Sequence, residues 1–269
     1  MFISPMLLHK TEQPFDSDDY ITELKLDGIR LLYSVDLQGK VRLYTRHKNE
    51  VTSKFPELVA LNSIPPGTVL DGELIVTNEE GKPDFEAVMS RFQSKRSHYC
   101  ISYVVFDVLL HRGESTVSIP LLKRKELLAE IVETDTEILS KSQFVEGNGA
   151  AFFELTKAQL LEGIVLKKKD SKYEIGKRSH SWLKCINYQY ADVLVTGYRK
   201  NEFGWLLSDY SGKPLGIMEL GVSEHERKRG YQAKRLQEST DFVFIEPFET
   251  KVKFREYTKA GLLRLPSLA

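Results

Sequence analysis

The sequence has few cysteines, no long apolar run and no excess of charge of either sign. Its 269 residues include two cysteines, Cys100 and Cys185, which lie far apart and outside C-x-x-C spacing. This spacing argues against a disulfide framework and against a structural zinc site, and favours buried thiols. No stretch approaches the roughly 18 apolar residues of a membrane span, and the N-terminus has no basic start typical of a secretory signal. We therefore expect a cytoplasmic protein that does not bind membranes.

The charge balance limits where a polyanion can bind. Lysine plus arginine number 38, as do aspartate plus glutamate, so the formal net charge is zero. A nucleic-acid surface must therefore be built from local basic clusters. With 41% hydrophobic residues the chain can bury one large core or two modest ones.

Short β-branched or aromatic runs alternate with turns and a few helical patterns, which predicts an α+β fold. In the first part of the chain, strands are expected at 20–26, 29–35, 41–45, 68–76, 101–110 and 163–168. Helices are expected there at 84–92, 121–132 and 150–161. After Asn187 the expected strands are 192–198, 205–209, 215–220 and 241–248, with one basic helix at 223–236. This second part suits a small OB-type β-barrel, and an extension of the first part's sheets is the alternative.

The most informative motif surrounds Lys25. The segment Glu23-Leu24-Lys25-Leu26-Asp27-Gly28-Ile29-Arg30 places a lysine at the end of an alternating strand, before an Asp-Gly turn. Alternation directs Lys25 away from the face that carries Leu24 and Leu26, toward a cleft or water. Such a lysine is suited to be a nucleophile, although an exposed lysine before an ordinary Asp-Gly hairpin turn gives the same pattern.

Further segments follow in a fixed order. They are Leu70–Val76 (L-D-G-E-L-I-V), Tyr103–Leu109 (Y-V-V-F-D-V-L), Leu161–Lys167 (L-E-G-I-V-L-K) and Ser181–Lys184 (S-W-L-K). Together with K-x-D-G-x-R they resemble the signature of the covalent nucleotidyltransferases, which include DNA ligases, RNA ligases and mRNA capping enzymes. The resemblance implies a nucleotidyltransferase domain of antiparallel, ATP-grasp-like sheets with helices over residues 1–187. It also implies a small OB-fold barrel over 188–269.

The resemblance implies that Lys25 carries the nucleotide through a P–N bond. A neutral amine must attack the α-phosphorus, so a lysine pKa of roughly 10.4 has to fall by about three units, or roughly 4 kcal/mol. A neighbouring cation and partial desolvation supply such a shift. Lys184 matches the family lysine that contacts the α-phosphate, and Arg30 and Arg46 add positive charge, Arg46 within the family's arginine segment after the first hairpin. A solvated surface role is the alternative for each arginine.

The resemblance gives the remaining cofactor residues separate roles. Glu73 matches a residue that bonds the ribose or reaches the metal through water, and Glu162 matches a ligand of a divalent ion. Magnesium is the expected metal, with manganese as a substitute, because hard cations prefer carboxylate and water oxygens. Phe106 is expected to stack on adenine and Glu23 to read its exocyclic amine, which favours ATP over GTP. A core phenylalanine and a surface glutamate are the alternatives.

Two basic tracts are candidates for binding DNA phosphates. One is Lys167, Lys168 and Lys169, continuing toward Arg178, and the other is Arg227, Lys228 and Arg229 on the expected basic helix. A solvated face is the alternative for either tract. The partner implied is nicked double-stranded DNA.

Two departures from the family pattern concern phosphate binding. Ile186 occupies the position of a second lysine after the tryptophan, and no R-x-D-K segment precedes Ala269. Charging of the lysine is therefore expected to be slow or to use other residues.

The sequence thus predicts a minimal, monomeric bacterial or phage ATP-dependent DNA ligase that acts at the nucleoid in replication, repair or recombination. It would seal nicks between a 3′-OH and a 5′-phosphate through lysyl-AMP and DNA-adenylate, alone or with an unidentified end-joining helper. The absence of a domain before Met1 argues against the NAD-dependent class. An RNA ligase, a capping-type nucleotidyltransferase and a catalytically lapsed nucleic-acid-binding module remain the alternatives.

Overall fold

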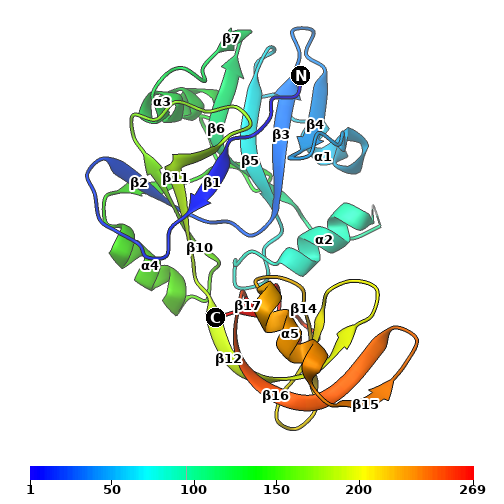
Figure 1. Ribbon diagram of the computed structural model, residues 1–269. Coiled ribbons are helices and arrows are strands. Elements are labelled where there is room, and N and C mark those ends of the chain that lie inside the picture. The colour runs from blue at the N-terminus through cyan, green and yellow to red at the C-terminus, as the bar shows by residue number, and fades with distance from the viewer. Residues whose placement is uncertain (95) are drawn as a thin grey trace. The chain divides into compact units, whose positions relative to one another are not determined.

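The chain forms two compact units, Met1–Asn187 and Tyr188–Ala269, in a computed structural model that describes residues 1–94 and 96–269 (Figure 1). The architecture is mixed α+β and rich in sheet. No helix in the described ranges is long and apolar enough to cross a membrane.

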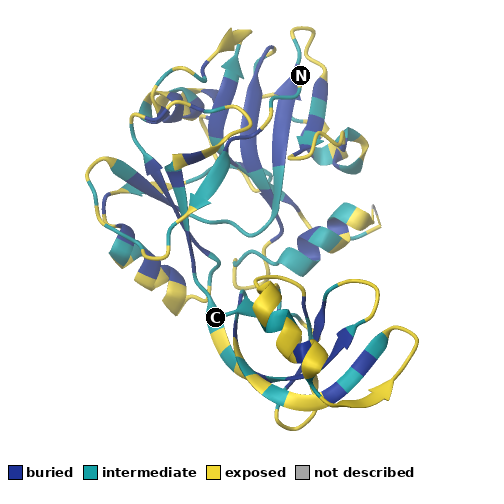
Figure 2. Cartoon of the chain, in the orientation of Figure 1, coloured by how far each residue is buried: buried dark blue, intermediate teal, exposed yellow. Residues whose placement is uncertain are grey.

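One sheet of the first unit follows the order β4-β3-β5-β6-β7, and β8 pairs with β6 in parallel. Its strands are β3 (Ile29–Val35), β4 (Val41–Thr45), β5 (Val69–Ile75), β6 (Ser102–His111), β7 (Glu114–Ser115) and β8 (Leu139–Lys141). The chain reverses between β3 and β4 through a tight turn at Gly39, whose φ of 82° suits glycine. Figure 2 shows buried residues running along the central strands β3 and β5.

The other sheet of the first unit follows the order β1-β11-β10-β2-β9. Its strands are β1 (Leu7–Lys10), β2 (Tyr20–Leu24), β9 (Phe144–Glu146), β10 (Gly163–Lys168) and β11 (Arg178–Ile186). The chain passes from this sheet to the other between β2 and β3, so Asp27 and Gly28 form a crossover and not a hairpin turn. Gly28 is required there, because a Cβ would lie 2.2 Å from the carbonyl oxygen of Leu74.

The two sheets share a core. Ile21 and Trp182 from one sheet are buried together with Leu32, Val69 and Leu109 from the other. Helix α2 (Phe85–Gln93) packs on β5, α3 (Leu121–Ile131) packs on β6, and α4 (Gly149–Ala158) packs on β10 and β2. Short η1 (Thr52–Lys54) and α1 (Pro56–Val59) follow β4. The functional residues described below lie on the strands around this shared core.

The second unit is a curved antiparallel sheet in the order β14-β13-β12-β16-β15, with β17 paired to β16. Its elements are β12 (Gln189–Arg199), β13 (Trp205–Ser208), β14 (Pro214–Met218), α5 (Glu224–Gln232), β15 (Arg235–Glu238), β16 (Phe242–Phe254) and β17 (Ser267–Leu268). A parallel bridge between Leu220 and Ser267 joins the segment after β14 to β17. The pairings therefore close into a ring around a core that contains Trp205 and Phe254.

Most expected elements occur within a few residues of the expected bounds. The expected strand at 20–26 ends at Leu24, and the expected helix at 223–236 ends at Gln232, because the chain continues as β15. The N-terminal strand β1 and the short strands β7, β8 and β9 were not expected. Strand β11 (Arg178–Ile186) was not among the expected strands either, although it contains the S-W-L-K segment.

Candidate active site

Lys25 lies immediately after β2, where the crossover to β3 begins. Its backbone N–H donates to the carbonyl of Gly163 at 2.9 Å, so this position stays tied to β10 although the strand has ended. Gly163 has a φ of 144°, and a Cβ there would lie 2.1 Å from the carbonyl oxygen of Cys185. Only a glycine at position 163 allows the backbones of β10 and β11 to come this close. The close approach keeps Glu162, the residue before Gly163, beside Lys25.

The side chains of Lys25 and Glu162 form an ion pair. The Nζ atom of Lys25 is 2.7 Å from Oε2 of Glu162, and the two side chains are 20% and 6% exposed. Two residues expected in different roles, the nucleophile and a metal ligand, are thus in direct contact. A partly desolvated pair interacts more strongly than an exposed surface pair.

Lys184 lies on β11 and belongs to a group of cations. Its pairing partners are Val165 on β10 and Lys10 on β1. Burial lowers the pKa of Lys184, and the charges of Lys25, Arg178, Arg46 and Lys10 lower it further. The expected neighbourhood of Lys25, Lys184 and Arg46 is therefore present, and the structure adds Lys10 and Arg178.

Glu73 lies on β5, with Arg30 as its pairing partner on β3. Burial raises the pKa of Glu73 to about 7, although the charges of Lys25 and Arg30 oppose this shift. Asp71 and Asp27 add to it through like-charge repulsion. Burial thus disfavours the charged form of the Glu73 carboxyl group, and the positive charge of Lys25 favours it.

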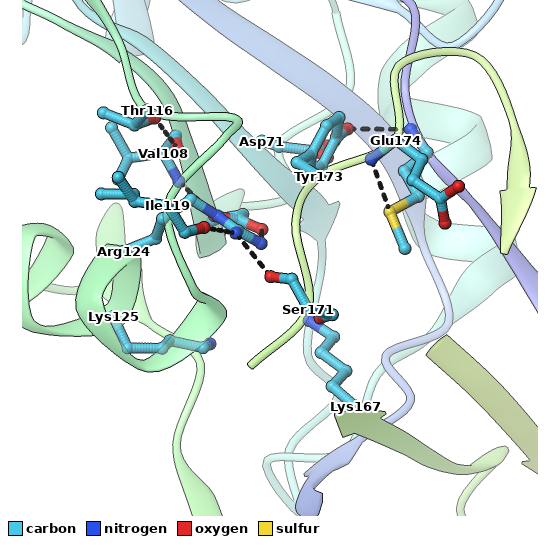
Figure 3. A network of polar contacts seen from close by, with 12 residues as sticks. Asp71, Val108, Thr116, Ile119, Arg124, Lys125, Lys167, Ser171, Tyr173 and Glu174 are labelled. Atoms are coloured by element: carbon cyan, nitrogen blue, oxygen red, sulfur yellow. Dashed lines mark hydrogen bonds and ion pairs between the residues drawn. The ribbon is translucent and has the colours of Figure 1, made fainter. Parts of the chain in front are cut away.

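Arg30 is held by a partner that the sequence did not predict. Its Nε and Nη2 atoms donate to the two carboxylate oxygens of Asp71 at 2.9 and 2.6 Å. The hydroxyl of Tyr173 donates to Asp71 at 2.6 Å, and Figure 3 shows Tyr173 beside Asp71. Bidentate pairing fixes the guanidinium plane, so part of the hydrogen-bonding capacity of Arg30 is used inside the fold.

Phe106 lies on β6, close to two cations. The Cζ atom of Arg30 is 5.3 Å from the centre of the Phe106 ring, and Nζ of Lys167 is 4.4 Å from it. Trp182 packs edge-on against Phe106, with the ring centres 6.3 Å apart. The ring packs against the shared core and is only partly buried.

Glu23 is buried and not at the surface. Its Oε2 atom lies 2.8 Å from Nζ of Lys167, and its Oε1 atom lies 2.5 Å from Nζ of Lys125 on α3. Burial alone would raise the pKa of Glu23, but the two ammonium groups outweigh it and hold the pKa below its ordinary value. Lys125 was missed by the sequence analysis, because nothing in a helical pattern marks a lysine that points inward.

A second buried ion pair supports the site from α3. Arg124 donates to both carboxylate oxygens of Asp107 at 2.7 and 2.8 Å, and neither side chain is exposed. Figure 3 shows Arg124 also donating to the carbonyls of Ile119 and Ser171. Asp107 follows Phe106, so this network fixes the strand segment that carries the aromatic ring.

The first basic tract differs from the prediction. Lys167 is 2% exposed and paired with Glu23, so it is not available to a DNA backbone in this structure. The reason is strand alternation: β10 directs Lys167 inward and leaves Lys168 on the other face. Lys168 pairs with Asp170 at 3.3 Å, and Lys169 pairs with Glu146.

The second basic tract lies on α5, as expected. Lys228 and Arg229 are exposed, whereas Arg227 is partly buried, with its Cζ atom 3.9 Å from the centre of the Phe203 ring. Arg229 stacks on Phe248 at 4.2 Å. A hollow of about 680 Å³ is lined by residues of α5 and of the β15–β16 region, including His225, Lys228, Arg229, Lys234 and Phe248.

The comparisons with known proteins agree on one family. Residues 5–185 match the family described as "ATP dependent DNA ligase domain". The SPbeta prophage-derived DNA ligase-like protein LigB of Bacillus subtilis is 52% identical over 268 residues, which are 99% of this chain and 98% of that protein.

A longer relative contains a similar region. The multifunctional non-homologous end joining DNA repair protein LigD of Mycobacterium tuberculosis H37Rv is 31% identical over an alignment of 294 residues in length. The alignment covers 98% of this chain and 38% of that protein.

Solved structures share the fold over nearly the whole chain. Mycobacterial DNA ligase D complexed with ATP and MES has a TM-score of 0.65 and 26% identity, covering 99% of this chain and 93% of that one. A Lig E DNA ligase has a TM-score of 0.72 at 19% identity, covering 100% and 99%, and shows likeness of fold alone. From the family match and the 52% identity we conclude that this chain belongs to the ATP-dependent DNA ligase family.

Proposed function

We propose that this protein seals nicks in double-stranded DNA, with Lys25 as the nucleophile that receives AMP from ATP. AMP then passes to the 5′-phosphate to give a DNA-adenylate, and the adjacent 3′-OH displaces AMP. The observation that carries the proposal is the position of Lys25 within 2.7 Å of Glu162. It joins the family's nucleophile motif to its E-G-I-V motif, which lies far away in the sequence.

Lys25 acts only as a neutral amine, so the resting ion pair has to separate before attack on the α-phosphorus. In this step the Lys25 nitrogen forms a bond to phosphorus, the bond to the bridging oxygen breaks, and pyrophosphate leaves. The proton of the ammonium group passes to solvent or to a neighbouring base. The cations around Lys25 favour this loss of a proton by repulsion.

Lys184 would stabilise negative charge on the α-phosphate as the bond to pyrophosphate breaks. Ile186 lies where the family pattern has a second lysine, and it is buried at 7% exposure. Besides Lys25, the cations Arg178, Arg46 and Lys10 lower the pKa of Lys184 through their charge. We assign them the charge that Ile186 cannot supply.

The acidic residues present fit a divalent ion that arrives with the triphosphate. No group of three or more His, Cys, Asp or Glu side chains in residues 1–94 and 96–269 is arranged to hold a metal by itself. Magnesium commonly uses one or two carboxylates and takes its other oxygens from phosphates and water. Glu162 and Glu73 would hold it here, and it would neutralise charge on the phosphates. Release of Glu162 from Lys25 then frees both residues for their roles.

Adenine binding is proposed at Phe106 and Glu23. The Phe106 ring is partly buried and would stack on the base. Glu23 lies near this ring, because Lys167 contacts both the ring and the Glu23 carboxylate. A carboxylate accepts a hydrogen bond from the exocyclic amine of adenine, whereas the exocyclic oxygen of guanine would be repelled. This arrangement supports ATP as the nucleotide donor.

The second unit is proposed to be an OB-fold that helps to hold DNA. Its support is the closed ring of pairings β12-β13-β14, then the Leu220–Ser267 bridge, β17, β16 and back to β12. Helix α5 lies between β14 and the later strands in the chain, as in an OB barrel. Exposed Lys228 and Arg229 on this helix give it a surface for phosphates. These DNA contacts would bring the protein to the nucleoid.

A nick that cannot be closed gives a direct test. With ATP, magnesium and a nicked duplex that ends in 2′,3′-dideoxyribose, the protein should accumulate DNA-adenylate, because the final displacement lacks its hydroxyl. The same duplex with a normal 3′-OH should be sealed, and Lys25→Ala should do neither. Efficient sealing by Lys25→Ala, or no DNA-adenylate from the parent protein, would refute the proposal.

A further inference from the structure

One carboxylate and two ammonium groups are buried together beside the proposed adenine site. Glu23 is 2% exposed, and the side chains of Lys125 and Lys167 are 6% and 3% exposed. The hydroxyl of Ser142 donates to Oε2 of Glu23 at 3.0 Å. The four groups come from β2, α3, β10 and the segment between β8 and β9, so the cluster forms only in the folded chain.

Two cations for one carboxylate are more than charge neutralisation requires. Burying a charge is costly unless it is paired, and Lys167 alone would pair Glu23. Burial lowers the pKa of Lys167 to about 8, and the charge of Lys125 contributes to that shift. The ammonium group of Lys125 therefore disfavours the charged form of Lys167. A role in stability alone does not explain such an arrangement.

The two oxygens of Glu23 differ in their hydrogen bonds. Oε2 accepts from both Lys167 and Ser142. Oε1 is buried and close to Lys125, yet neither it nor Nζ of Lys125 makes a well-directed hydrogen bond within the described part of the chain. A carboxylate has about four acceptor positions, so Oε1 retains capacity for a donor from a ligand.

Adenine can supply such a donor. Its 6-amino group donates, whereas guanine carries an acceptor oxygen at this position and unsubstituted purine carries only hydrogen. The Nζ atom of Lys167 lies 2.8 Å from Oε2 of Glu23 and 4.4 Å from the centre of the Phe106 ring, so the Glu23 carboxylate lies close to this ring. A base stacked on Phe106 would thus have the Glu23 carboxylate, with its oxygen Oε1, nearby.

We propose that Lys125 is a specificity-determining positioning residue, which holds Oε1 of Glu23 toward the 6-amino group of adenine and so selects ATP over nucleotides without that group. The inference rests on the proposed function, because it takes Phe106 and Glu23 as the adenine site. Lys125 acts through Glu23 and takes no part in the transfer of AMP itself.

The test compares kcat/KM for formation of the Lys25 adduct with ATP and with purine riboside triphosphate, which lacks the 6-amino group. Lys125→Met should reduce the preference for ATP by about tenfold or more, as expected for a misdirected hydrogen bond to a charged group. Lys125→Arg should keep most of the preference. Lys123→Met is the matched control, because Lys123 lies on the same helix, is 65% exposed and pairs with Glu126.

A double variant shows whether Lys125 acts through Glu23. Glu23→Gln should lower the preference for ATP, and adding Lys125→Met should lower it little further, because both changes affect one hydrogen bond. Lys125→Gln, which removes the charge and keeps a polar side chain, gives the same comparison if the Met variant does not fold.

The result that would refute the role of Lys125 differs from the result that would refute the proposed function. If Lys125→Met or Lys125→Gln slows both nucleotides by the same factor and leaves their ratio unchanged, Lys125 is only structural and the inference is wrong. If the parent protein forms no Lys25 adduct with ATP, the proposed function itself fails.

Discussion

The Nζ atom of Lys25 lies 2.7 Å from Oε2 of Glu162, so the nucleophile is paired with the carboxylate that is expected to bind the metal. An ion pair with a carboxylate favours the charged, unreactive form of a lysine. In the proposed mechanism, Lys25 has to leave this pair before it attacks, and a metal bound by Glu162 would weaken the hold of Glu162 on Lys25. Under that proposal, loading of the nucleotide and metal would be linked to activation of the lysine.

Glu162→Ala and Lys184→Ala should respond differently to metal. Loss of a metal ligand weakens metal binding, so adenylation by Glu162→Ala should be low at 1 mM magnesium and recover partly at high magnesium or manganese. Lys184→Ala removes a phosphate contact and should not recover. Rates measured across a metal titration check this, and recovery of Lys184→Ala alone would reverse the two roles.

Glu73 should make stability depend on pH. Its pKa of about 7 in the folded chain lies above its ordinary value of 4.5, so its contribution is fully present below pH 4.5 and is lost as the pH rises through 7. Glu73→Gln stays neutral, so its free energy of unfolding relative to that of the parent should rise by about 2–3 kcal/mol from pH 5 to pH 8. Urea unfolding at both pH values measures this difference.

The matched control for this pH dependence is Glu79→Gln, at an exposed position. It should change stability equally at pH 5 and pH 8. A Glu73→Gln variant that behaves in the same way would show that Glu73 is ionised throughout this range.

Arg124 should be essential for stability rather than for the reaction. It is fully buried and bonds both oxygens of Asp107, so Arg124→Met leaves a buried carboxylate without its partner. We expect a loss of about 3–5 kcal/mol in the free energy of unfolding. Arg124→Met combined with Asp107→Leu should lose less than the sum of the single changes, and additive losses would show that the two residues do not act as a pair.

The basic face of α5 should bind DNA phosphates. Lys228→Glu with Arg229→Glu should weaken binding to a nicked duplex and flatten the slope of log affinity against log salt by about 0.9 per lost contact. Arg227 is left intact because it is partly buried against Phe203, whereas Lys228 and Arg229 are exposed. Formation of the Lys25 adduct should not change, and Lys213→Glu, at another exposed position of the unit, is the control. An unchanged salt slope would show that this face is merely solvated.

The sequence predicted the elements better than the partners of the charged residues. Runs of β-branched and aromatic residues located β3, β4 and β10, because the apolar side chains of these strands are buried. Such runs do not show which charged side chains of different strands meet inside the protein. Lys167 was therefore expected at the DNA surface, although it is buried against Glu23.

Contacts between distant segments account for the other differences. The bidentate pair of Arg30 with Asp71 depends on the register between β3 and β5, and the hydroxyl of Tyr173 comes from a loop with no regular pattern. The Asp27-Gly28 pair looked like a hairpin turn because a hairpin and a crossover between sheets share the same local signal. Local patterns do not encode which sheet the next strand joins.

The most direct test of the account is the covalent adduct on Lys25. After incubation with α-labelled ATP and magnesium, the protein should carry label through denaturing electrophoresis, and the bond should be acid-labile and base-stable, as a P–N bond to lysine is. GTP and NAD should give no adduct, and Lys25→Ala should abolish it. A labelled band of the same stability on Lys25→Ala, or none on the parent protein, would contradict the central claim.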